Sequence, residues 1–192
     1  MAQTDYPIIT FTTIEEWETW LAKNHSKLPG IWIQFFKKNS GINSVSRSEV
    51  LDIALCYGWI DGQAKSLDEK AWLQKYTPRR PKSIWSKRNT EHVTRLIKEG
   101  KMKPAGLAEI EKAKADGRWE NAYDSPTTMT IPQDFLIALS KNKKAKDFFE
   151  TLNKTNIYAI VWRLQTAKKP ETKMKRIHAI VTMLSKREKF YP

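Results

Sequence analysis

Residues 31–36 read Ile-Trp-Ile-Gln-Phe-Phe, and this run limits the possible folds of the chain more than any other feature. Its β-branched and aromatic side chains favour a strand that is apolar on both faces. Two more short strands are expected at residues 59–65 and 71–77, joined by a polar turn at residues 66–69. The sequence therefore predicts a small, mostly antiparallel sheet.

Helical patterns surround these strands. In a capping box, Ser or Thr precedes Glu by three residues at the start of a helix. Two helices before residue 58 are expected to start in this way, and the second is apolar nearly all round, which predicts a central position. Two more helices are expected after the strands, at about residues 89–100 and 104–116, the first with Asn89 as its N-cap. The capping-box residues are Thr12 and Thr13 before Glu15 and Glu16, and Ser46 before Glu49.

Beyond Thr130 all apolar spacings are helical, and the loop 119–130 with Pro126 marks a boundary. We therefore expect the α+β class: a small, mostly antiparallel sheet with packed helices, followed by a basic C-terminal helical part. The expected domains are residues 1–124 and 125–192.

Positive charge is concentrated near the C-terminus. The formal net charge is +13, and residues 141–189 alone hold 14 Lys and Arg against 4 Asp and Glu. Such a region attracts polyanions such as nucleic acid or an anionic membrane surface. The alternative is a set of solvated helix faces that keep the protein soluble, and the sequence leaves both interpretations open.

The sequence also limits the cellular setting. No run approaches the roughly 18 apolar residues of a membrane span, and residues 1–10 lack the pattern of a signal peptide. The single cysteine, Cys56, lies in the most apolar helix and is expected to be a buried structural thiol. We expect a cytoplasmic protein without a transmembrane segment.

A cluster of donors and aromatic rings around residues 79–89 is the sharpest candidate for a ligand site. Arginine and lysine offer charge-assisted hydrogen bonds, and the tryptophan offers a stacking surface. The free backbone N–H groups at a helix start can bind an anion. The two prolines at 78 and 81 suggest an extended, fixed conformation. A small anionic ligand with a phosphate or carboxylate suits this inventory. The candidate residues are Asp61, Arg79, Arg80, Lys82, Ser83, Trp85, Ser86 and Asn89.

Other interpretations of these residues remain. The tryptophans can be core residues, and Asn89 can be only a helix N-cap. The arginines can form ion pairs with Asp61 or Asp68. If the chain is an enzyme acting on a small phosphorylated or acidic substrate, Asp61 is the candidate acid or base. We favour a binding protein without catalysis, and the protein partner, if any, is unknown.

The C-terminal helices give a third hypothesis, weak nonspecific nucleic-acid binding through phosphate contacts. Its residues are Lys168, Lys169, Lys173, Lys175 and Arg176. No glycine-rich nucleotide loop is present, and the three histidines lack zinc spacing, so neither a cofactor nor a metal is expected.

Five spaced motifs carry a family resemblance. They include Cys-Tyr-Gly-Trp-Ile-Asp-Gly at 56–62 and Thr-Pro-Arg-Arg-Pro-Lys-Ser-Ile-Trp-Ser-Lys-Arg-Asn at 77–89, followed by residues 100–106, 116–119 and 167–173. In this order they resemble the YdeI/OmpD-associated (bacteriocin-protection) family over nearly the whole chain. Family members often carry Arg where this chain has Lys173 and Lys175, and Lys holds an anion less well than the bidentate guanidinium does.

The resemblance implies a role in protection against bacteriocins or antimicrobial peptides, and it implies no catalytic residues. A chain with a net charge of +13 repels a cationic peptide. Any protective role is therefore expected to be indirect.

Overall fold

The computed structural model describes residues 6–192, which group into two compact units. The first unit holds the described residues up to Ser83 together with residues 89–120. The second unit holds residues 84–88 together with residues 121–192. Each unit is therefore assembled from two separate pieces of the chain, whereas the sequence analysis placed one boundary after residue 124.

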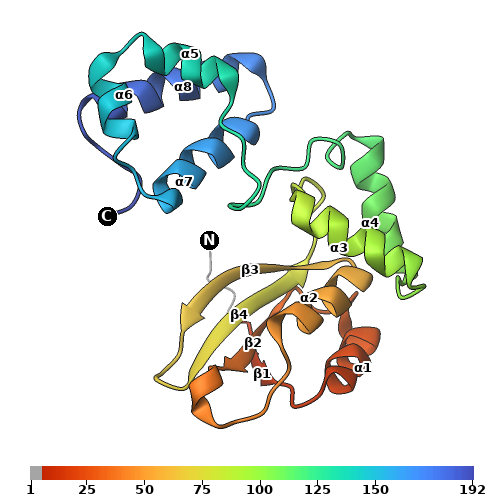
Figure 1. Cartoon of the computed structure of the whole chain (residues 1–192). Coiled ribbons are helices and arrows are strands. Elements are labelled where there is room, and N and C mark those ends of the chain that lie inside the picture. Colours follow the sequence, from red (N-terminus) through yellow and green to blue (C-terminus); the bar gives the residue numbers. More distant parts are fainter. Residues whose placement is uncertain (1–5) are drawn as a thin grey trace. The chain divides into compact units, whose positions relative to one another are not determined.

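The first unit is built from a four-stranded sheet and the helices α1 to α4 (Figure 1). The strands are β1 (Ile8–Thr10), β2 (Ile31–Phe36), β3 (Trp59–Ser66) and β4 (Ala71–Pro78). The helices are α1 (Ile14–Asn24), α2 (Arg47–Cys56), α3 (Lys87–Lys98) and α4 (Pro104–Ala115), with a short 3-10 turn, η1 (Lys38–Ser40), before α2.

The strand order is β1-β2-β4-β3. Strand β1 is parallel to β2, whereas β4 is antiparallel to both β2 and β3. The expected small and mostly antiparallel sheet of an α+β protein is confirmed. The register of β3 against β4 shifts between Asp61 and Ala64, and there the buried Gln74 donates a hydrogen bond of 2.6 Å to the carbonyl of Gly62. This hydrogen bond satisfies a backbone acceptor that the irregularity leaves outside the ladder.

Strand β2 is buried on both faces, as its composition predicts. Ile31 and Ile33 on one face are fully buried, and Trp32 on the other is 8% exposed. The Lys65 ammonium lies 4.4 Å from the centroid of the Trp32 ring, and that of Lys75 lies 5.3 Å from it. Lysine side chains therefore cover part of the aromatic ring on that face, a favourable cation–π arrangement.

Capping boxes start α1 and α2 as predicted. The side chain of Thr13 accepts from the backbone N–H of Glu16, and the Glu16 carboxylate accepts from Thr13 in return. Ser46 and Glu49 repeat this arrangement before α2. These local hydrogen bonds satisfy backbone N–H groups that the first helical turn leaves without an acceptor.

Aromatic residues fill the core of the first unit. Trp17 of α1, Trp59 of β3 and Tyr76 of β4 are at most 1% exposed. The ring centroid of Trp17 lies 6.4 Å from that of Trp59 and 5.9 Å from that of Tyr76, both in edge-on geometry. Both indole N–H groups donate hydrogen bonds of 3.0 Å to backbone carbonyls, Trp17 to Val50 and Trp59 to His25. The two tryptophan rings are thus buried with their N–H groups satisfied, whereas the buried hydroxyl of Tyr76 has no hydrogen-bond partner among residues 6–192.

The close approach of α2 and α4 depends on glycine. A Cβ atom on Gly106 would lie 2.3 Å from the carbonyl oxygen of Cys56 and 2.7 Å from that of Leu55. Gly58, which follows α2, has a φ of +73° and ends that helix in the left-handed conformation. The two glycines let the end of α2 lie directly against the first turn of α4.

The second unit is helical, as predicted for the chain beyond residue 130. Its helices are α5 (Gln133–Ser140), α6 (Lys143–Phe149), α7 (Lys154–Gln165) and α8 (Pro170–Ser185). Phe135, Ile160 and Leu184 are fully buried at the centre of their common core. The segment 84–88 joins this unit through a single bridge between Ser86 and Tyr123, and the N–H of Tyr123 donates to the Trp85 carbonyl at 3.0 Å.

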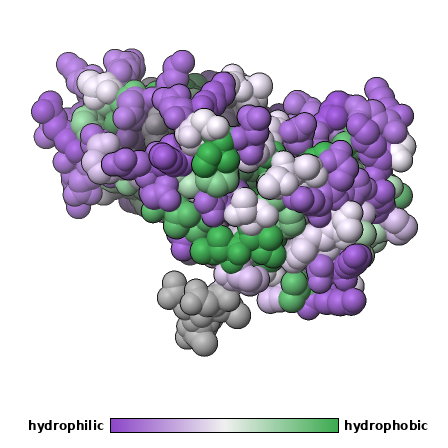
Figure 2. Space-filling model, turned by 90° about the horizontal axis from the view of Figure 1, so that it is seen from below, coloured by the Kyte–Doolittle hydropathy of each residue, from purple (hydrophilic) through white to green (hydrophobic). Residues whose placement is uncertain are grey.

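The surface is mainly polar. On the face drawn in Figure 2, hydrophilic residues predominate and hydrophobic residues show in a few areas between them. Exposed large hydrophobic side chains belong to separate elements, for example Ile8, Ile137 and Met174. Within residues 6–192, no helix combines the length and the apolar character needed to cross a membrane.

We expect Gly106→Ala to destabilise the first unit by about 1–3 kcal/mol, the usual cost of overpacking a close contact. The new methyl group must push apart two backbones, because the nearest atoms belong to the main chain of α2. The midpoint of urea unfolding measures this change. Gly62→Ala is the matched control, since its Cβ would meet only ordinary contacts at 3.8 Å. Equal midpoints for the two variants would contradict the packing described here.

Candidate functional site

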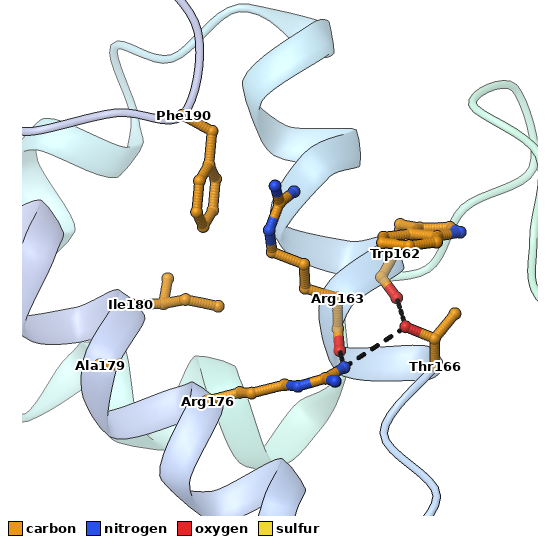
Figure 3. Close-up of a pocket in the computed structure, with 7 residues that line it drawn as sticks. All are labelled: Trp162, Arg163, Thr166, Arg176, Ala179, Ile180 and Phe190. Carbon is orange, nitrogen blue, oxygen red and sulfur yellow. Dashed lines mark hydrogen bonds between the residues drawn. The ribbon is translucent and has the colours of Figure 1, made fainter. Parts of the chain in front are cut away.

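A hollow of about 360 Å³ opens on the second unit beside α7 and α8 (Figure 3). Two arginines, two aromatic rings and one hydroxyl line it, together with small and aliphatic side chains. No Asp or Glu is among the described residues that line it. The lining residues are Trp162, Arg163, Thr166, Arg176, Ala179, Ile180 and Phe190.

Arg163 is held against an aromatic ring. Its guanidinium carbon lies 3.8 Å from the centroid of Phe190, and its Nη1 donates to the Ala159 carbonyl at 2.9 Å. A planar guanidinium on a ring face is in a favourable cation–π arrangement that also restricts the side chain. The positive charge of Arg163 is thereby positioned at the edge of the hollow.

Arg176 enters the same hollow from α8. Its Nη1 donates to the backbone carbonyl of Arg163 and, at 3.4 Å, to the hydroxyl of Thr166. The Thr166 hydroxyl donates in turn to the Trp162 carbonyl at 2.7 Å. Carbonyl groups at the end of a helix lack intrahelical partners, so Arg176 caps α7 as well as lining the hollow. Its other N–H groups make no further hydrogen bond to residues 6–192.

The surroundings of the hollow are cationic. Residues 141–189, which include α6, α7 and α8, carry an excess of ten positive charges. Two guanidinium groups near an apolar floor can bind an anionic group that is attached to a flat apolar body.

The candidate residues 80–83 form a turn. Pro81 follows Arg80, and the N–H of Ser83 donates to the Arg80 carbonyl at 2.9 Å. The expectation of an extended segment is wrong here, because the fixed φ of proline also suits the second position of a β-turn. Arg80 and Lys82 are exposed, whereas Arg79 is 6% exposed.

Arg118 fixes this turn, and sequence reasoning assigned it no such role. Its side chain is 7% exposed, its Nε donates to the carboxylate of Asp116 at 2.7 Å, and its Nη1 donates to the Ser83 carbonyl at 2.7 Å. The short spacing Asp-Gly-Arg at 116–118 is the sequence signal of this arrangement.

Asp61 pairs with an unexpected arginine. Its carboxylate lies 2.7 Å from Nη2 of Arg47, at the start of α2, and its side chain is 17% exposed. Asp68 instead accepts from the backbone N–H groups of Lys70 and Ala71 in the turn between β3 and β4. The partners of these two carboxylates therefore differ from the arginines at 79 and 80 that the sequence suggested for them.

The remaining predicted ligand residues lie at the start of α3. Trp85 and Ser86 are buried and belong to the second unit, whereas Asn89 belongs to the first, with Asp61, Arg79, Arg80, Lys82 and Ser83. Helix α3 begins at Lys87, so Asn89 lies inside its first turn and the expected N-cap is wrong. The Tyr123 carbonyl accepts from the N–H of Lys87 at 2.9 Å and so satisfies a donor of the first turn without the Asn89 side chain.

The five predicted phosphate-contacting residues differ in their surroundings. Lys168, Lys169 and Lys175 are exposed. Lys173 forms an ion pair of 2.6 Å with Asp134 and so ties α8 to α5. Only Arg176 of the five lines the hollow beside α7 and α8, where it meets Arg163, a residue that the sequence analysis did not select.

A buried carboxylate, Asp124, organises the second unit. Its side chain is 4% exposed, lies 2.6 Å from the ammonium of Lys87, and accepts from Gln165 at 2.6 Å. It also accepts from the N–H and hydroxyl of Thr130 at 3.3 Å. Burial alone would raise the pKa of Asp124, but these hydrogen bonds outweigh burial and hold the pKa below its ordinary value of 3.8.

A second polar cluster joins α2 to α3 in the first unit. Asp52 accepts from His92 Nδ1 at 2.6 Å and from the guanidinium of Arg95, which also contacts Glu99. Within residues 6–192 no three His, Cys, Asp or Glu side chains gather in a way that could hold a metal ion. This cluster is a set of paired charges at a helix interface.

The two units together define an α+β protein with a helical unit that carries an arginine and aromatic hollow. Residues 9–109, slightly more than half of the chain, match the model of a family described as a domain of unknown function (DUF8412), and the chain belongs to this family. Residues 128–187 match the family described as "Bacteriocin-protection, YdeI or OmpD-Associated", which supports the suspected family, and one of the five motifs, residues 167–173, lies within this match. No curated protein and no solved structure matches the chain.

The second match coincides with the helical unit. It spans α5 to α8 and contains every residue that lines the hollow except Phe190.

Asp124→Asn should destabilise the helical unit at neutral pH by about 2 kcal/mol, the scale of hydrogen bonds to a charged group. Since folding lowers the pKa of Asp124, its stabilising effect is present above pH 3.8 and is lost as the pH falls below that value. The stability difference between wild type and variant should therefore shrink on acidification. Urea unfolding at several pH values measures it, with the exposed Asp147→Asn as control. A difference independent of pH would contradict this assignment.

Cys56 should react only after unfolding. The thiol is 1% exposed, and burial, followed by the charges of Asp52 and Glu18, raises its pKa to about 11. Since the thiolate is the reactive form, labelling by an aromatic disulfide at mildly alkaline pH should be about a hundredfold slower in the folded protein than in urea. Similar rates in both conditions would show that the thiol is accessible and not part of the core.

Proposed function

We propose that this protein binds small anions through the hollow on its helical unit, with Arg163 and Arg176 as the binding residues. The observation that carries the proposal is that two guanidinium groups from neighbouring helices line one open hollow without a carboxylate among its described lining residues. A ligand that joins a phosphate or carboxylate to a flat apolar group suits both the charges and the aromatic rings.

A separate hollow of about 440 Å³, on α3, supports anion binding less well. Its arginine, Arg95, already pairs with Asp52 and Glu99, and the carboxylate of Glu91 lies in its lining. A ligand would have to compete with these carboxylates for Arg95. In the part of the chain that the structure describes, Arg163 and Arg176 donate to backbone carbonyls and to the Thr166 hydroxyl, and no carboxylate lines their hollow.

The wider role is proposed from the family match and from charge. A protective function against bacteriocins would be indirect, because the chain and a cationic peptide repel each other. We therefore propose binding without catalysis, in the cytoplasm, as the activity that such a role would use. Two other hypotheses stay predictions. One is an enzyme with Asp61 as acid or base, and the other is an anion site formed by Asp61, Arg79, Arg80, Lys82, Ser83, Trp85, Ser86 and Asn89.

Phenyl phosphate is a suitable probe, because it combines an anion with a planar ring. Titration followed by NMR should shift the indole N–H of Trp162 and the side-chain N–H signals of Arg163 and Arg176. Arg176→Gln should weaken binding at least about tenfold, the effect of losing a charge-assisted hydrogen bond. Lys175→Gln is the matched control, since it removes the same charge from an exposed position on the same helix.

The phenyl phosphate titration can give three distinguishable results. Selective loss in Arg176→Gln, in a variant whose circular dichroism matches that of the wild type, supports the hollow as the site. Equal weakening in both variants would show diffuse charge attraction and overturn the proposal. Shifts confined to residues 79–83 would move the anion site to the proline turn.

A further inference from the structure

A second hollow adjoins the first along α7. Its volume is about 370 Å³, close to that of the first. Trp162 and Arg163 line both hollows, so these two residues stand between them. The second hollow is completed by two tyrosines and by small residues: Thr155, Tyr158, Ala159 and Tyr191.

The spacing along α7 explains this continuity. Residues that recur at three- and four-residue intervals lie on one face of a helix. The α7 residues that line the two hollows have this spacing: 155, 158, 159, 162, 163 and 166. From Tyr158 to Trp162 the helix rises about 6 Å. This distance is close to the separation of successive phosphates in an extended nucleotide strand. The face therefore offers repeated aromatic positions at a nucleotide-like interval.

Each hollow offers an aromatic surface beside a positive charge. Tyr158 and Trp162 are half-buried, Tyr191 is 48% exposed, and Phe190 stacks with Arg163. Exposed aromatic rings bind unpaired bases by stacking, and arginine binds both phosphates and base planes. No Asp or Glu is among the described residues that line either hollow.

We propose that the face of α7 formed by the two hollows binds single-stranded nucleic acid, with bases against Tyr158 and Trp162 and phosphates against Arg163 and Arg176. This inference rests on the proposed anion site and names its ligand class. A duplex suits the face less well, because paired bases are hidden and only its phosphates would engage the arginines. The excess of positive charge in residues 141–189 adds long-range attraction for the strand.

The test compares a labelled oligo-dT or oligo-U of about ten nucleotides, within the usual site sizes of single-strand binders, with a duplex of equal length. Fluorescence anisotropy should show tighter binding of the single strand. Tyr158→Leu should weaken oligonucleotide binding about tenfold, as expected for the loss of one stacked base. The affinity for phenyl phosphate should stay unchanged in this variant, because Tyr158 lines only the second hollow. The ratio of oligonucleotide affinity to phenyl phosphate affinity should therefore fall about tenfold.

Lys144→Gln is the charge control, since Lys144 is exposed on α6 and lines neither hollow. Its effect should be small and should vanish as salt is added. Equal weakening by Lys144→Gln and Tyr158→Leu, or equal binding of duplex and single strand, would overturn the inference.

The two proposals fail in distinguishable ways. Binding of phenyl phosphate without tighter binding of the oligonucleotide would leave the anion site standing and remove the strand site. Absence of binding by both probes would remove both proposals.

Discussion

The arrangement of the helical unit depends on one buried carboxylate. Asp124 precedes the first helix of the unit, yet its partners come from three other places: Lys87 at the start of α3, Thr130 in the loop, and Gln165 at the end of α7. A buried carboxylate without its hydrogen bonds carries a large desolvation cost. The partners of such a carboxylate are therefore held in fixed positions. The carboxylate therefore sets where α7 ends, and the end of α7 is where Arg176 meets Arg163.

Much of the fold could be predicted from local signals. The capping boxes at Thr13 and Ser46, the apolar run 31–36 and the helical spacing after residue 130 each depend on interactions within a few residues of the chain. Such signals are readable because helix starts and strand faces are decided by near neighbours. The turn at residues 80–83 was misjudged, since proline alone does not distinguish an extended segment from a turn.

The candidate site was harder to predict, because it is assembled from distant residues. Arg163 looks like any charged residue on an amphipathic helix, and only the packing of Phe190 on its guanidinium gives it a fixed position. Arg176 was selected for its charge within a lysine-rich stretch, and its hydrogen bonds to the end of α7 have no local sequence signal. Equally, the partner of Asp61 is Arg47, fourteen residues earlier, whereas the sequence pointed to Arg79 or Arg80, eighteen and nineteen residues later.

The division of each unit into two pieces has a consequence for synthesis. Residues 84–88 emerge from the ribosome long before Tyr123 and the helices α5 to α8, with which they form the second unit. The first unit is likewise completed only when residues 89–120 have followed. Domains usually fold as continuous segments, in order from the N-terminus. In this protein the early segment must wait for its partners, since α5 begins 45 residues after Arg88 and α8 begins 82 residues after it.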